Sequence, residues 1–168
     1  MSEFSSEEQE LKLRLRLAQI ERNEACQDEF LTFVRTMWPQ FVTGRHHEII
    51  AEKLERVASG SLKRLIINMA PRHTKSEFAS FLFPAWMMGR NPSMKIIQAT
   101  HTTELAVNFG RKTKNLIESE GFQEVFPEVK LAADSKASGR WDTSAGGMYY
   151  AVGVGSNLAG RGGDLVII

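Results

Sequence analysis

One short segment of the sequence has residue types that suit phosphate chemistry, residues 69–76, which read MAPRHTKS. A phosphate-binding loop needs backbone N–H groups around the phosphates, a lysine that reaches the β- and γ-phosphate oxygens, and a hydroxyl group that binds Mg²⁺. Lys75 and Ser76 are the residue types for the last two roles. A helix that starts here would also direct its N-terminus at the phosphates. The segment therefore predicts a binding site for the phosphates of a nucleotide.

The same segment departs from the usual pattern G-x-x-x-x-G-K-[ST] at both glycine positions, which Met69 and Thr74 occupy. Glycine adopts the positive φ angles of such a loop without crowding, whereas a β-branched residue such as Thr74 is strained there. By pattern alone, the segment is a Lys-Ser pair between a predicted strand and a predicted helix. A basic strand-to-helix turn without a ligand is the alternative interpretation.

The neighbouring elements predict the architecture that would hold this loop. Strands are predicted at residues 65–67, 94–99 and 165–168, and a β-hairpin at residues 139–143 and 148–154. Helices are predicted at residues 5–37, 45–58 and 75–88, and from Thr102 or Thr103 to about residue 120. This alternation of strands and helices favours an α/β fold with a mostly parallel sheet flanked by helices.

Two parts of the helical prediction rest on particular residues. Leu11, Leu13, Leu15 and Leu17 alternate with basic residues, which is the period of a strand, but the good helix formers on both sides favour one helix over residues 5–37. Gly60 is expected to end the helix at residues 45–58.

The composition bounds the classes of function. The 168 residues suffice for one domain, and 42% hydrophobic with 24% charged residues is a globular balance. The formal net charge of +1 gives no support for nucleic-acid binding by the chain as a whole, so that a DNA contact would need a local patch. Cys26 is the single cysteine, which excludes an internal disulfide. The sequence has neither an apolar run of membrane-spanning length nor a signal-peptide pattern at its start.

From residue 33 to residue 168, the chain resembles the ATPase domain at the N-terminus of the large terminase subunit of tailed bacteriophages. The segments that carry the likeness read FVTGRHHEII from residue 41, RLIINMAPRHTKSE from 64, FPAW from 83, GFQEVFP from 121, WDT from 141 and GRGGDLVII from 160. The resemblance implies an ASCE-type P-loop NTPase fold. It also implies an N-terminal helical segment at residues 1–40 and an incomplete ATPase domain at residues 41–168.

The resemblance also implies roles for individual residues, with ATP and Mg²⁺ as cofactors. Lys75 would neutralise the β/γ-phosphate charge, Ser76 would bind the magnesium ion, and Arg72 would sense or stabilise the γ-phosphate. Arg161, between glycines, would be an arginine finger that reaches a neighbouring subunit and acts in catalysis with Arg72. The nucleotide-binding residues would be Pro71, Arg72, His73, Thr74, Lys75 and Ser76.

The activity implied by the resemblance is ATP hydrolysis coupled to the translocation of double-stranded viral DNA into the procapsid. The implied partners are that DNA, the portal protein, the small terminase subunit and further copies of the chain in a homopentameric ring, without a membrane. The implied location is the host cytoplasm, transiently at the portal vertex. Two alternatives stay open: another P-loop DNA translocase or helicase, and an inactive terminase remnant that acts only in assembly.

The end of the chain raises one further expectation. In the family, the strand at residues 165–168 delivers the acidic Walker B residues, which would follow residue 168, and Asp164 lies at the opposite end of that strand. We therefore expect the chain by itself to be inactive as an ATPase. The family also places one more strand between the strand at 65–67 and the strand at 165–168. The resemblance thus predicts a gap of about 10 Å in the sheet, or two inter-strand spacings.

Overall fold

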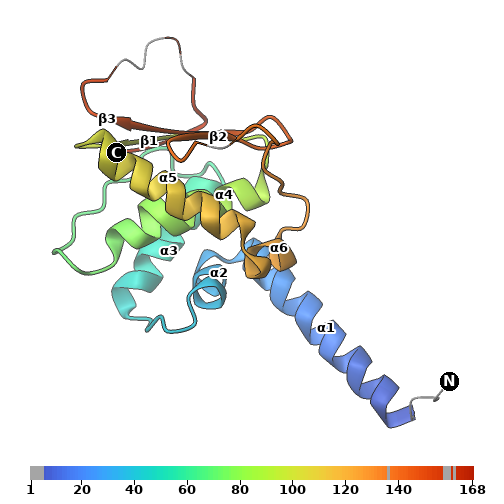
Figure 1. Cartoon of the computed structure of the whole chain (residues 1–168). Coiled ribbons are helices and arrows are strands. Elements are labelled where there is room, and N and C mark those ends of the chain that lie inside the picture. The colour runs from blue at the N-terminus through green and yellow to red at the C-terminus, as the bar shows by residue number, and fades with distance from the viewer. Residues whose placement is uncertain (1–5, 136, 157–159, 161) are drawn as a thin grey trace.

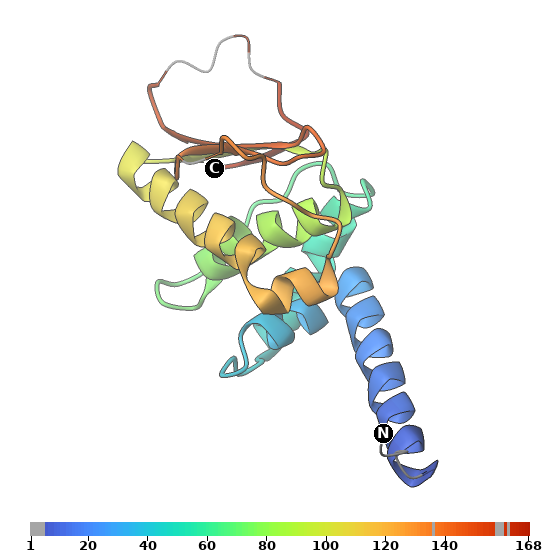
Figure 2. The same ribbon diagram turned by 45° about the vertical axis from the view of Figure 1, so that its right-hand side comes forward.

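A four-stranded sheet forms one layer of the protein, and helices cover one of its faces (Figures 1 and 2). The computed structural model describes residues 6–135, 137–156, 160 and 162–168. The strands are β1 (Lys95–Thr100), β2 (Arg140–Asp142), β3 (Met148–Gly153) and β4 (Leu165–Ile167), in the spatial order β2-β3-β1-β4. β1 is parallel to both β3 and β4, whereas β2 and β3 form the predicted antiparallel hairpin. The α/β class with a mixed, mainly parallel sheet is therefore confirmed.

β1 lies inside the sheet because it is apolar on both of its faces. Ile96 points toward the helices and joins the main core, in which it is fully buried. Ile97 points to the opposite face, where it packs with Ala99 and Val152 in a smaller cluster. The parallel register pairs Ile97 with Tyr150 of β3 and with Val166 of β4. β1 thus joins the hairpin to the last strand.

The helices begin and end close to the predicted positions. They are α1 (Ser6–Asp28), α2 (Phe30–Met37), α3 (Arg45–Ala58), α4 (Phe83–Arg90), α5 (Thr103–Glu118) and α6 (Glu120–Val125), and a π-helical segment η1 (Glu77–Leu82) leads into α4. α3 has the predicted bounds, and Gly60, at φ 75°, follows its end as expected. Thr102 caps α5, because its hydroxyl accepts a hydrogen bond from the backbone N–H of Leu105 at 3.2 Å.

The prediction of one helix over residues 5–37 is wrong, because the helix breaks at Glu29. That residue has an extended backbone, with φ −113° and ψ 117°. The break turns α2 so that Phe30 and Phe33 are fully buried in the core. The Glu55 carboxylate of α3 accepts a hydrogen bond from the Phe30 N–H at 2.8 Å, which satisfies one free donor at the start of α2. Burial of aromatic side chains and this cap together outweigh the helix propensity of the segment.

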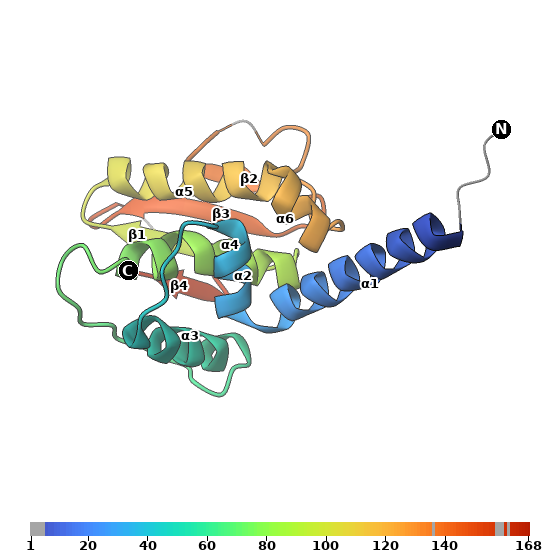
Figure 3. The same ribbon diagram turned by 90° about the horizontal axis from the view of Figure 1, so that it is seen from below.

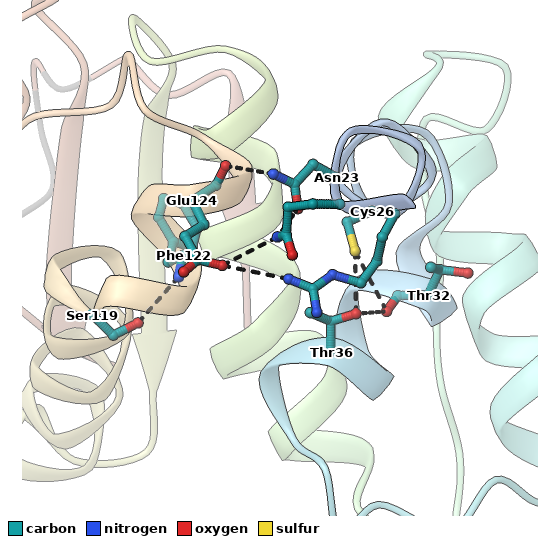
Figure 4. Close-up of polar contacts among 9 residues, drawn as sticks. Asn23, Cys26, Thr32, Thr36, Ser119, Phe122 and Glu124 are labelled. Atoms are coloured by element: carbon teal, nitrogen blue, oxygen red, sulfur yellow. Dashed lines mark hydrogen bonds and ion pairs between the residues drawn. The ribbon is translucent and has the colours of Figure 1, made fainter. Parts of the chain in front are cut away.

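α1 extends away from the rest of the protein, and its C-terminal half contacts the other helices (Figure 3). The Asn23 side chain donates to the Glu124 backbone carbonyl of α6 at 2.8 Å (Figure 4). The Gln27 side chain donates to the Val125 carbonyl at 2.6 Å, and the Trp86 indole donates to the Cys26 carbonyl at 2.8 Å. The alternating leucines of the N-terminal half, Leu11, Leu13, Leu15 and Leu17, lie in the helix as predicted and are all more than half exposed.

The prediction of a buried strand at residues 65–67 is also wrong. Leu65 and Ile67 are half-buried against the core, but Ile66 between them is 84% exposed. The alternation is that of a strand, yet residues 63–69 form no backbone–backbone hydrogen bond within the described part of the chain. A strand exists only by pairing, and β4, at the edge of the sheet, pairs with β1 alone among the described strands.

The contact between α5 and β3 generates a stability prediction. A Cβ atom on Gly110 of α5 would lie 2.5 Å from the Ser138 carbonyl oxygen and 3.0 Å from the Tyr149 ring. We expect Gly110→Ala to lower the free energy of unfolding by about 1–3 kcal/mol, because the overpacked helix must move off the sheet. Urea denaturation measures this change.

Gly121→Ala is the matched control. Gly121 lies in α6, and a Cβ there meets nothing within 4 Å. Its substitution should leave stability unchanged or raise it by up to about 1 kcal/mol through helix propensity. Equal stability changes for the two variants would contradict the close helix–sheet contact.

Candidate functional site

The loop at residues 69–76 has two residues in the left-handed backbone region. Arg72 has φ 63° and Thr74 has φ 60°, and they are the only non-glycine residues with positive φ in the described part of the chain. Each such residue is held against a local strain of about 1–3 kcal/mol. Thr74, at the second glycine position, therefore has the positive φ angle at which a β-branched residue is strained. Strain of this kind persists only where surrounding contacts fix the backbone, and it is concentrated at functional sites.

The loop leads directly into a helix whose first turn contains Lys75 and Ser76. The Phe78 N–H donates to the Thr74 carbonyl at 3.0 Å, which joins the loop to that first turn. Arg72 and Ser76 are exposed, and Lys75 is half-buried. The side chains of these three residues form no hydrogen bond or ion pair with any described residue, so that their charges and hydroxyl are free to meet a ligand.

A histidine on α3, His47, contacts the loop through a hydrogen bond to Thr74. The His47 ring accepts a hydrogen bond at Nδ1 from the Gly44 backbone N–H at 2.9 Å. Its Nε2 lies 2.7 Å from the Thr74 hydroxyl oxygen. That hydroxyl donates in turn to the His73 carbonyl at 2.6 Å. One chain of hydrogen bonds thus runs from the start of α3 into the left-handed part of the loop.

The His47 ring is enclosed by other rings and is only 6% exposed. It stacks on Phe78 at 5.0 Å between ring centroids and meets the edge of Phe41 at 4.7 Å. The His46 ring lies 3.8 Å away, and the His73 ring lies 6.0 Å beyond that of His46. Burial lowers the pKa of His47 below its usual value, and electrostatic interaction with His46 and His73 lowers it further. His47 is therefore neutral at pH 7.

A groove of about 850 Å³ runs beside the loop, between residues 62–67 and the free edge of β4. Lys75 and Ser76 line it together with Ile167 and Ile168. The exposed side chain of Ile66 adds an apolar surface to the groove. The groove lies between the two segments where the resemblance predicts a missing strand. Its volume is within the range of about 300–1,000 Å³ that is usual for ligand sites.

The loop fits a magnesium ion only as part of a nucleotide complex. Mg²⁺ is usually held by one or two carboxylates together with phosphate oxygens and water. Ser76 offers one hydroxyl oxygen. Among the described residues that line the groove, Asp164 is the only one with a carboxylate side chain, and it directly precedes β4. This carboxylate accepts a hydrogen bond from the backbone N–H of Lys95 at 2.8 Å. The neighbouring Glu77 carboxylate is paired with Lys112 at 2.9 Å.

The structure brings some of the predicted site residues together and leaves one unplaced. Residues 71–76 form one loop and helix start, as expected from their adjacency. Asp164 lies at the N-terminal end of β4, away from the end where a Walker B acid is expected. Arg161 lies outside the described residues. In the described ranges, no group of three His, Cys, Asp or Glu side chains is arranged to hold a metal ion.

The contact between His47 and Thr74 was not predicted, although the sequence contains a signal for the burial of His47. His47 falls on the same face of α3 as Ile50, Ala51 and Leu54, all of which are buried. A histidine on the apolar face of an amphipathic helix must find a polar partner inside the protein. The identity of that partner, Thr74, depends on how α3 packs against the loop.

No protein-family model, curated protein or solved structure matches the chain. None of the helices that the structure describes is long and apolar enough to cross a membrane.

The buried, neutral His47 predicts a pH-dependent stability. In the unfolded chain, a histidine takes up a proton below about pH 6.5, whereas folded His47 does so only at lower pH. Its contribution to stability is therefore complete above about pH 6.5 and decreases as the pH falls from there toward the lowered folded-state pKa. The expected slope is at most about 1.4 kcal/mol per pH unit for this one proton.

Urea denaturation between about pH 5 and pH 7.5 measures this dependence, and His47→Phe removes it. The variant should show a shallower loss of stability below about pH 6.5 than the wild type, since the other histidines are common to both proteins. Parallel curves for the two proteins would show that His47 titrates normally in the folded state.

Proposed function

We propose that residues 69–76 bind the phosphates of ATP, and that the chain is the nucleotide-binding part of an ATPase that packages double-stranded DNA into a viral procapsid. One observation supports the proposed phosphate site. An exposed loop with two left-handed residues, Arg72 and Thr74, leads into a helix whose first turn contains a lysine and a hydroxyl that have no partner among the described residues. The DNA-packaging role rests on the resemblance to large terminase subunits.

The proposed chemistry follows from where charge is needed. A nucleotide triphosphate carries several negative charges, and a helix N-terminus offers free backbone N–H groups together with the positive end of the helix dipole. The left-handed turns at Arg72 and Thr74 allow successive N–H groups of the loop to converge on one side, as in an anion-binding nest. Lys75 would neutralise charge on the β- and γ-phosphates, and Arg72 would approach the γ-phosphate from the exposed side of the loop.

Mg²⁺ would supply further charge neutralisation between the β- and γ-phosphates, and Ser76 is the hydroxyl that would hold it there. Hydrolysis also requires a group that orients the attacking water. The one described carboxylate that lines the groove, Asp164, is already hydrogen-bonded to the Lys95 N–H. The described residues therefore support nucleotide binding more directly than hydrolysis.

The position of Asp164 favours one competing function, a nucleotide-binding assembly component without ATPase activity. Such a protein would bind ATP through Lys75 but release no phosphate, even with double-stranded DNA and portal protein present. Another DNA translocase or helicase would share the loop but would not require portal protein for its activity. Phosphate release measured with and without each partner separates these functions.

Removal of the lysine charge tests the binding site. We expect Lys75→Ala to weaken binding of Mg-ATP by about 10-fold to 100-fold, because a charge-assisted hydrogen bond to phosphate is lost. Isothermal titration calorimetry with the full chain measures the dissociation constant.

Lys130→Ala is the matched control, since it removes the same charge from an exposed residue that contacts Gln123 rather than the loop. It should bind Mg-ATP as the wild type does. Equal dissociation constants for Lys75→Ala and the wild type would rule out the proposed phosphate site.

A further inference from the structure

We propose that His47 is a positioning residue for the phosphate loop: its hydrogen bond to Thr74 holds that residue in the left-handed conformation that glycine adopts unaided. The effect on nucleotide affinity rests on the proposed function. The coupling between the two side chains does not, because it is a property of the protein without ligand.

The direction of each hydrogen bond follows from one obligatory donor. The Gly44 backbone N–H can only donate, so His47 Nδ1, 2.9 Å away, must be the unprotonated nitrogen. A neutral His47 then carries its proton on Nε2, which donates to the Thr74 hydroxyl oxygen at 2.7 Å. The Thr74 hydroxyl is left to donate to the His73 carbonyl at 2.6 Å. Each polar atom in this series of hydrogen bonds therefore has a partner. The direction of donation, from Gly44 to the His73 carbonyl, cannot be reversed.

The geometry makes this chain of bonds a constraint on the loop backbone. Thr74 has φ 60°, where a β-branched side chain is strained. Its hydroxyl is held on one side by His47 and on the other by the carbonyl of the preceding residue, which fixes the torsion between them. A return of Thr74 to negative φ would turn the peptide before it relative to Lys75. The N–H groups of the loop would then no longer converge on a phosphate.

The ring of His47 has little freedom to follow such a movement. It is stacked on Phe78 of η1, in the helix after the loop, and it meets the edge of Phe41. The ionisable groups that face it are His46 on the same helix and His73 in the loop, and both disfavour a second proton on the ring. The ring is therefore a rigid, neutral support that connects α3 to Thr74.

A double-mutant cycle in the full chain tests the inference. The four proteins are the wild type, His47→Phe, Thr74→Gly and the double variant. His47→Phe keeps an aromatic ring between Phe41 and Phe78 but removes both hydrogen bonds. We expect it to raise the dissociation constant for Mg-ATP by about 10-fold when Thr74 is present, and by less than about 2-fold in the Thr74→Gly background. Glycine needs no support at positive φ, so the histidine becomes dispensable.

A merely structural role for His47 predicts a different result. Loss of packing would weaken binding by the same factor in both backgrounds, and that outcome would overturn the inference. The absence of any effect of His47→Phe would overturn it as well. His46→Phe is the matched control, since His46 contacts the His47 ring but forms no hydrogen bond to the loop among the described residues. It should show no coupling to Thr74→Gly.

Measurements without ligand separate this inference from the proposed function. Nitrogen-15 NMR of the wild type should show His47 as the neutral tautomer protonated at Nε2, and the tautomer protonated at Nδ1 would contradict the inference. Urea unfolding of the four proteins should show that His47→Phe lowers the folding equilibrium constant about 10-fold more when Thr74 is present than in the Thr74→Gly background.

Coupling in unfolding without any binding of Mg-ATP would leave the inference standing and refute the proposed function. Thr74→Val is the second test if His47→Phe does not fold. It keeps the β-branched shape and the strain but removes the hydroxyl, and it should weaken Mg-ATP binding by about 10-fold. Wild-type affinity in Thr74→Val would overturn the inference.

Discussion

The aromatic contact between α2 and the helix that follows the loop is the interaction on which the rest of the structure depends. The Phe30 ring lies 5.7 Å from Phe78, 5.5 Å from Phe83 and 5.3 Å from Trp86, and all four side chains are buried. Large aromatic surfaces of this kind dominate the energy of a core. They fix η1 and α4, and therefore the direction in which the first turn presents Lys75. The break between α1 and α2 at Glu29 exists because this burial requires it.

Two backbone segments beside the loop have unsatisfied hydrogen-bonding groups. Residues 63–69 and the outer edge of β4 both lack backbone partners within the described part of the chain, and the groove of about 850 Å³ separates them. Exposed edges of this kind can accept another strand. The loop that carries Arg72 is joined directly to the unpaired segment. Its conformation is therefore held from α3 and from the following helix, not from a sheet.

That arrangement explains why a strained loop needs a side-chain support. In a loop with glycine, positive φ has little energetic cost and the backbone alone determines the shape. Here Thr74 requires an outside contact, and His47 supplies it from a helix that is itself packed in the core. Burial of the histidine keeps it neutral, which the chain of hydrogen bonds requires. The packing of His47 thus determines its neutral state, and its hydrogen bond supports the backbone conformation of Thr74. The proposed phosphate site depends on all three.

The sequence by itself determined most of the helices, the hairpin, the α/β class and the position of the Lys75–Ser76 pair, because local periodicity and adjacency along the chain are enough to define them. It also showed that Thr74 occupies a glycine position of the phosphate-loop pattern, where a positive φ would strain a β-branched residue. Only the tertiary structure decided the break at Glu29, the absence of a strand at residues 65–67 and the hydrogen bond between His47 and Thr74. Each of these depends on atoms that are distant in sequence: a helix bends to bury its aromatic rings, a strand exists only beside another strand, and a buried polar group binds whatever the fold brings to it.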